Sequence, residues 1–94
     1  MIVVWAESAV EHLQAIHDYL AQTSPQYAVY LVDRITNRSK QIAAFPLSGR
    51  IVPEYGRPQI RELIENQYRI LYHIGPEQIE VIAAIHNRQQ IPLN

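Results

Sequence analysis

The chain has 94 residues, is 48% hydrophobic, and carries a formal net charge of −1 with a sequence pI near 6.4. This length limits it to one domain, residues 1–94, with a single modest core, and the small net charge argues against a general nucleic-acid binder. The absence of cysteine excludes disulfides and thiolate chemistry, and the absence of a long apolar run or a signal sequence predicts a cytoplasmic protein without membrane association.

A strand and a first helix are predicted at the N-terminus. Residues 1–5 are apolar and β-branched, which is typical of a buried strand. Ser8 and Glu11 form an S-x-x-E capping box, which predicts that a helix begins there. The side chains that recur at helical spacing and define its core stripe are Ala9, Leu13, Ile16 and Leu20, widened by Val10 and His17.

A second, longer helix follows after two or three residues. Ser24 is the predicted N-cap, Pro25 suits the first helical position, and Pro46 ends the helix. The predicted core stripe consists of Ala28, Leu31, Ile35, Ile42 and Phe45, with Ser39 at the intervening position. Because the connection is short, the two helices should form an antiparallel hairpin.

The second half of the chain predicts a sheet. Residues 46–59 are rich in proline and glycine and are expected to form a loop. Residues 60–64, 68–74 and 78–86 read as three strands of an antiparallel meander, separated by turn-forming residues. Residues 89–94 are expected to be a frayed tail, because Pro92 opposes a further strand. The predicted fold class is α+β, with a small twisted sheet.

Basic and imidazole side chains among these strands are the candidate site residues. Side chains alternate across a strand, so an aligned register could bring Arg69, His86 and Arg88 together on one partly open sheet face. Of these, His86 alone exchanges protons near neutral pH. The alternative is that the arginines form ordinary ion pairs with Glu62 or Glu80.

Other kinds of site have no motif in the sequence. His12 and His17 lie five residues apart, so they do not face each other as i, i+4 metal ligands. There is no glycine-rich phosphate loop and no G-x-S-x-G nucleophile turn. We therefore expect neither a metal nor a cofactor.

Several short motifs together resemble the ParE branch of the ParE/RelE toxin superfamily. They are Trp5, the helical hairpin, and the segments PLSGRIVPE (46–54), IREL (60–63), YRILY (68–72) and IHNR (85–88). The resemblance covers nearly the whole chain. It implies an N-terminal strand, a helical hairpin and an antiparallel sheet, and it implies the toxin of a type II toxin–antitoxin pair. The antitoxin of such a pair wraps the toxin and represses their shared operon.

The superfamily implies two alternative activities. ParE-like members bind DNA gyrase and block it, which is a binding activity. RelE-like members are ribosome-dependent, metal-independent messenger-RNA endonucleases, in which basic side chains on the sheet stabilise the charge on the scissile phosphate. By this resemblance, Arg69 matches the sheet arginine of the nucleases and Arg88 falls near a second one, and His86 completes the set of candidate catalytic residues for a ribonuclease.

The sequence departs from the nuclease pattern in two places. Residues 60–63 replace alternating lysines with a segment in which Glu62 puts a carboxylate where a phosphate would need a cation. Residues 89–94 lack the C-terminal tyrosine. We therefore expect a ParE-like, non-enzymatic toxin that arrests growth by binding gyrase. The expected target contacts are Arg61, Arg69, His86, Arg88 and the tail, with the helical-hairpin surface as an alternative; a chain that has lost toxicity is a third reading.

The expected partner is a cognate antitoxin. We expect the antitoxin to bind by the two common modes of peptide recognition, an amphipathic helix laid beside the helical hairpin and a strand added to an open sheet edge. The second helix carries Arg34, Arg38 and Lys40, which an acidic antitoxin tail would match.

Overall fold

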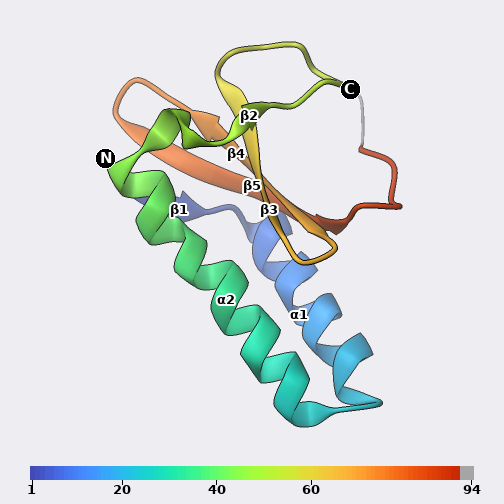
Figure 1. Ribbon diagram of the computed structural model, residues 1–94. Helices are drawn as coiled ribbons and strands as arrows, with labels where there is room; N and C mark the ends of the chain where they lie inside the picture. The colour runs from blue at the N-terminus through green and yellow to red at the C-terminus, as the bar shows by residue number, and fades with distance from the viewer. Residues whose placement is uncertain (92–94) are drawn as a thin grey trace.

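Two antiparallel helices cover one face of a five-stranded mixed sheet (Figure 1). The structure is a computed structural model and describes residues 1–91. In chain order the elements are β1 (Ile2–Trp5), α1 (Glu7–Ala21), α2 (Pro25–Ala44), the 3-10 helix η1 (Pro46–Ser48), β2 (Arg50–Ile51), β3 (Ile60–Glu65), β4 (Tyr68–Ile74) and β5 (Gln78–His86). The predicted α+β order of strand, helical hairpin and antiparallel meander is confirmed.

The strand order in the sheet is β1-β5-β4-β3-β2. Strands β2 to β5 pair antiparallel, whereas β1 pairs parallel with β5, from Ile2 opposite Gln78 to Trp5 opposite Val81. The N-terminal strand is thus an edge strand, and Ile2 is 70% exposed rather than buried as predicted. The expectation that residues 46–59 form only a loop was also wrong, because Arg50 and Ile51 pair with Glu62 and Arg61 of β3.

A β-bulge in the last strand decides which side chains share a face. Leu71 of β4 lies opposite Ala83, but the next residue, Tyr72, lies opposite Val81, so the register shifts at this point. A bulge of this kind changes the parity of side-chain alternation. Side chains on β5 beyond the bulge therefore point to the opposite face from the one that unbroken alternation predicts.

The two faces of the sheet have separate apolar clusters. The larger lies under the helices and includes Ile16, Leu31, Ile35, Ile70, Tyr72, Ile79, Val81 and Ala84. Trp5 borders it and donates a hydrogen bond from Nε1 to Ser39 Oγ at 2.8 Å, which explains a serine on the core stripe of α2. The smaller cluster lies on the other face and consists of Val52, Leu71, Ala83, Ile85 and Ile91.

The helix ends test the local predictions. Ser24 Oγ accepts the Tyr27 N–H at 3.2 Å, so the predicted cap of α2 is confirmed. The predicted capping box of α1 was wrong: that helix begins at Glu7 after Ala6, and Ser8 Oγ donates to the Ile82 carbonyl oxygen at 3.0 Å. The hydroxyl serves a tertiary contact with β5 instead of the first turn of its own helix.

Three further expectations about burial were wrong. Val10 and Phe45 are 52% and 67% exposed; Phe45 is the C-cap of α2, where the backbone is no longer helical, so it does not continue the core stripe. Ile91 is 6% exposed and packs in the smaller apolar cluster, so the chain is not frayed at that residue. The rest of the predicted tail, residues 92–94, lies outside the described residues. Within residues 1–91, neither helix combines the length and apolar character that crossing a membrane requires.

Candidate functional site

Arg69 and His86 point to opposite faces of the sheet. Arg69 lies opposite Ile85, on the face with the smaller apolar cluster, whereas His86 lies opposite Tyr68, on the helix-covered face. The predicted convergence of Arg69, His86 and Arg88 on one face was therefore wrong. The physical reason is the β-bulge between the Leu71 and Tyr72 pairings, which the sequence pattern does not reveal.

Arg69 is buried in a network with two carboxylates. Its side chain is 9% exposed, its Nε donates to Glu62 Oε1 at 2.5 Å, and its two terminal nitrogens donate to the two oxygens of Glu54 at 2.8 and 2.9 Å. Arg50 Nε donates to the other oxygen of Glu62 at 2.5 Å. The alternative prediction of an ion pair with Glu62 is confirmed. Glu54 was missed, because it lies in the loop between β2 and β3 and no local pattern links it to β4.

This network fixes the charge state of its members. The hydrogen bonds from Arg69 lower the pKa of Glu54 to about 2, and the two carboxylates raise the pKa of Arg69 further above its usual range. Two guanidinium groups and two carboxylates thus balance each other on this face of the sheet. Within this network, each guanidinium group has a carboxylate partner, so neither is left uncompensated for an anionic ligand.

Arg61 has a structural role. Its Nε donates to the Pro58 carbonyl oxygen at 2.9 Å, and its Nη1 donates to the Gly49 carbonyl oxygen at 3.0 Å. These bonds tie the segments before β2 and before β3 to the sheet. The guanidinium is half-buried and is largely occupied by backbone acceptors.

The basic face of α2 is also partly neutralised. Arg34 and Arg38 each donate from Nε to a different oxygen of Glu65, both at 2.9 Å. Burial acts to raise the pKa of Glu65, but the hydrogen bonds from these two arginines outweigh it and lower the pKa. Lys40 stays exposed, so less positive charge remains on α2 than the sequence suggested.

His86 and Arg88 lie together at the C-terminal end of β5. The His86 Nδ1 accepts the backbone N–H of Arg88 at 3.1 Å, and its Nε2 lies 3.1 Å from Gln67 Oε1. This pattern assigns the neutral tautomer with the proton on Nε2. Arg88 is exposed, and within residues 1–91 its guanidinium has neither an ion pair nor a hydrogen bond.

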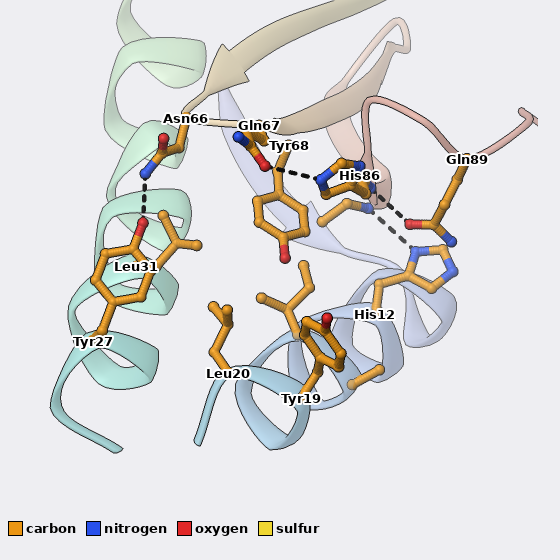
Figure 2. Close-up of a pocket in the computed structure, with 13 residues that line it drawn as sticks. His12, Tyr19, Leu20, Tyr27, Leu31, Asn66, Gln67, Tyr68, His86 and Gln89 are labelled. Carbon is orange, nitrogen blue, oxygen red and sulfur yellow. Dashed lines mark hydrogen bonds between the residues drawn. The ribbon is translucent and has the colours of Figure 1, made fainter. Parts of the chain in front are cut away.

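His86 also lines a pocket between the helical hairpin and the sheet (Figure 2). The pocket has a volume of about 550 Å³ and contains five aromatic side chains, namely His12, Tyr19, Tyr27, Tyr68 and His86. None of its thirteen lining residues is Lys, Arg, Asp or Glu. The sequence did not predict this pocket, because it joins residues from both helices, the β3–β4 turn and the end of β5. Within residues 1–91, no three His, Asp or Glu side chains are grouped as metal ligands.

Comparisons with known proteins agree with this fold. A family model described as the ParE toxin of the type II toxin–antitoxin system parDE matches residues 3–92. Toxin RelE2 of Caulobacter vibrioides is 29% identical over 85 residues, which cover 89% of this chain and 92% of that protein.

Two solved structures have the same fold. The chromosomal ParDE toxin–antitoxin system from P. aeruginosa aligns with a TM-score of 0.76 and 22% identity, covering 92% of this chain and 95% of that one. The YoeB/ParE toxin from Agrobacterium tumefaciens aligns with a TM-score of 0.64 and 16% identity, covering 92% and 98%. The match of the family model over nearly the whole chain shows that this protein belongs to the ParE toxin family of type II toxin–antitoxin systems.

Proposed function

We propose that this toxin acts by binding and inhibiting DNA gyrase, and that a cognate antitoxin neutralises it. The observation that carries the proposal is the ion-pair network around Arg69. A nuclease of this superfamily would use that arginine to stabilise charge on a phosphate, whereas here two carboxylates already occupy it. A binding activity needs no such free cation.

The chemistry of RNA cleavage also argues against a nuclease site at Arg69. Negative charge builds on the phosphate in the transition state and has to be met by preorganised positive groups. A phosphate at Arg69 would have to displace the bidentate Glu54 and would then face the buried carboxylate of Glu62. His86 lies on the other face of the sheet, so it cannot transfer a proton to a group bound at Arg69.

The target-binding surface that we propose is the end of β5 with His86 and Arg88. Arg88 is exposed and unpaired within residues 1–91, so it can reach a protein partner without breaking an internal hydrogen bond or ion pair. Arg69 is buried and Arg61 is bound to backbone carbonyl groups, so neither is as accessible. Arginine is also the charged residue most often found at the energetic centre of interfaces.

The antitoxin has two surfaces suited to it. Exposed apolar side chains on the helical hairpin would pack against an amphipathic helix; they are Val10, Tyr19, Val29 and Tyr30. The sheet edges β1 and β2 would each accept an added strand. Because Arg34 and Arg38 are held by Glu65, charge attraction on α2 contributes less than the sequence suggested.

A supercoiling assay tests the proposal. Purified gyrase is incubated with relaxed plasmid and antitoxin-free toxin, with and without the antitoxin. We expect the toxin to inhibit supercoiling and the antitoxin to reverse the inhibition. Folded toxin that leaves supercoiling unchanged would overturn the proposal.

The alternative is a ribosome-dependent messenger-RNA endonuclease. The name of the Caulobacter relative, Toxin RelE2, at 29% identity, supports it. This reading predicts that toxin and ribosomes together cleave messenger RNA, and that His86→Ala abolishes cleavage. His73→Ala is the matched control, because His73 is an exposed histidine on β4. Intact RNA with the unmodified protein would remove this alternative.

A further inference from the structure

The hydroxyl group of Tyr68 lacks a hydrogen-bond partner among the described residues. Tyr68 is only 9% exposed, and its side chain points into the pocket between the helical hairpin and the sheet (Figure 2). Every fully buried side-chain nitrogen or oxygen atom in residues 1–91 has a hydrogen-bond partner. The Tyr68 oxygen must therefore reach the open space of the pocket. Burial raises the pKa of Tyr68, so the hydroxyl keeps its proton and is a donor aimed at that space.

Aromatic side chains from both helices lie near the Tyr68 hydroxyl. Tyr19 of α1 and Tyr27 of α2 flank Tyr68, and Leu20 lies at the base (Figure 2). The ring of His86 meets the ring of Tyr68 edge-on, with centroids 5.4 Å apart. Such a set of rings offers faces and edges on which another flat ring can stack.

The polar groups of the pocket are neutral and leave donors and acceptors unused. Asn66 Nδ2 donates to the Tyr27 hydroxyl at 2.7 Å, so the Tyr27 proton is left to donate. His12 Nδ1 accepts the Ala84 N–H at 3.2 Å, so the Nε2–H of His12 is also left without a hydrogen-bond acceptor. The Asn66 side-chain oxygen accepts no hydrogen bond from residues 1–91.

From this geometry we infer that the pocket binds a neutral, planar heteroaromatic molecule of the size of a nucleobase or nucleoside, with an acceptor atom facing the Tyr68 hydroxyl. A volume of about 550 Å³ lies within the usual range for small-molecule sites. A nucleobase has flat faces for the tyrosines and an edge of donors and acceptors for the amide and imidazole groups.

Other ligand classes fit the lining less well. A phosphate or carboxylate would find no Lys or Arg in the pocket, and an amine would find no Asp or Glu. An alkyl chain would fill the volume but would leave the Tyr68 hydroxyl and the amide groups without partners, which costs binding energy. The ligand has to combine aromatic faces with uncharged polar edges.

Nuclear magnetic resonance titration of the antitoxin-free toxin tests the inference. Adenosine, guanosine, cytidine and uridine are added separately, and backbone amide shifts are followed. At least one nucleoside should give saturable shifts confined to residues 66–68, 84–89 and the facing helix surfaces. The matching 5′-monophosphate should bind no more tightly than its nucleoside, because the lining has no cation.

The variant Tyr68→Phe separates binding from folding. It removes a hydroxyl that has no partner within residues 1–91, so the thermal midpoint should not fall. Affinity for the nucleoside should fall about threefold to tenfold, the ratio for one neutral hydrogen bond. Tyr30→Phe is the matched control, because Tyr30 is 53% exposed on α2 and does not line the pocket; its affinity should be unchanged.

Three results would overturn the inference. One is the absence of saturable shifts with all four nucleosides up to about 10 mM, a concentration far above the dissociation constant of a specific site. The same result is expected if a side chain of a partner protein is the natural occupant of the pocket. Another is equal affinity in Tyr68→Phe and the unmodified toxin. The third is saturable shifts confined to residues outside the pocket.

Discussion

Arg69 donates hydrogen bonds from both terminal nitrogens to the two oxygens of Glu54, at 2.8 and 2.9 Å. This bidentate geometry is the one in which a guanidinium group also binds phosphate. Glu54 therefore occupies the position that an anionic ligand of Arg69 would take. The same contact holds the loop between β2 and β3 against the open face of the sheet.

Glu54→Gln should lower the free energy of unfolding at neutral pH, and this loss should vanish in acid. Arg69 lowers the pKa of Glu54 from 4.5 to about 2. A carboxylate with a lowered pKa in the folded state contributes stability above its unfolded pKa and loses it as pH falls through the folded value. The difference between the two proteins should therefore be constant near pH 7 and shrink between about pH 4.5 and 2. Urea unfolding across this range measures it.

The size of this effect should be modest. The Glu54 side chain is 35% exposed, so solvent screens the pair. Glu77→Gln is the control for loss of a negative charge, because Glu77 is exposed and has no ion pair within residues 1–91. A stability difference for Glu54→Gln that stays the same from neutral pH to about pH 2 would contradict the prediction.

Glu62→Gln should destabilise the fold much more than Glu54→Gln does. Glu62 is 1% exposed and accepts from both Arg50 and Arg69. Arg50 can turn into solvent, but Arg69 cannot, so part of a buried charge is left unpaired. We expect a loss of about 3 kcal/mol, the lower end for such a change because Glu54 remains. Chemical denaturation measures the loss.

A double variant tests the cause of that loss. If the cost comes from the uncompensated guanidinium, Glu62→Gln combined with Arg69→Met should be more stable than Glu62→Gln alone. Arg50→Ala is the control, because the Arg50 side chain is 62% exposed and its loss should cost about 1 kcal/mol or less. Strictly additive losses in the double variant would show that the charge is not the cause.

Gly49→Ala should also be destabilising. A Cβ atom at this position would lie 2.6 Å from both the Glu62 carbonyl oxygen and the Tyr72 hydroxyl. That hydroxyl accepts the Gly49 N–H and donates to the Pro46 carbonyl oxygen, so it cannot move freely. We expect a loss of about 1–3 kcal/mol, measured as a lower thermal midpoint.

A second glycine gives the control for this substitution. Gly56 has a φ of +64° and open space around its Cβ position, so Gly56→Asn, which tolerates that backbone region, should be nearly neutral. If Gly49→Ala were as stable as Gly56→Asn, the close approach of Gly49 to Glu62 of β3 and to Tyr72 would not be the reason for a glycine at this position.

Under the proposed function, Arg88→Ala should weaken gyrase inhibition without affecting the fold. Its exposed guanidinium makes no hydrogen bond or ion pair within residues 1–91, so the thermal midpoint should not change. We expect about a tenfold higher toxin concentration for half-inhibition of supercoiling, as for a central interface arginine. Arg57→Ala removes another exposed arginine, in the loop before β3, and should have little effect. Equal losses in the two variants would indicate a general charge effect instead of a specific contact.

Local chemistry allowed much of the fold to be predicted from sequence. Ser24 and Pro25 determine the start of α2 through one side-chain hydrogen bond and a fixed φ, so neighbouring residues carry the information. The alternation in residues 68–72 correctly assigned Ile70 and Tyr72 to one face and Leu71 to the other. These features depend on contacts within a few residues.

Features that depend on distant partners could not be predicted in this way. Ser8 of α1 donates to Ile82 of β5, and Glu54 of the β2–β3 loop pairs with Arg69 of β4, and no local pattern links either pair of segments. The face of the sheet to which His86 points depends on a bulge four residues earlier, where Ile82 has no partner on β4. A single extra residue in the ladder thus separates two candidate site residues that simple alternation places together.

The parallel pairing of β1 with β5 affects how this chain can be made in the cell. Ile2 pairs with Gln78, so β1 leaves the ribosome well before its partner strand β5 has been synthesised. Strand β5 also pairs with β4 and packs against α1, so the helical hairpin has no completed sheet to cover until residue 86 has emerged. The loop that must close runs from Ile2 to Gln78, and closing so long a loop makes this step slow. A prematurely terminated chain that lacks β5 would therefore be an unfolded peptide instead of a partly active toxin.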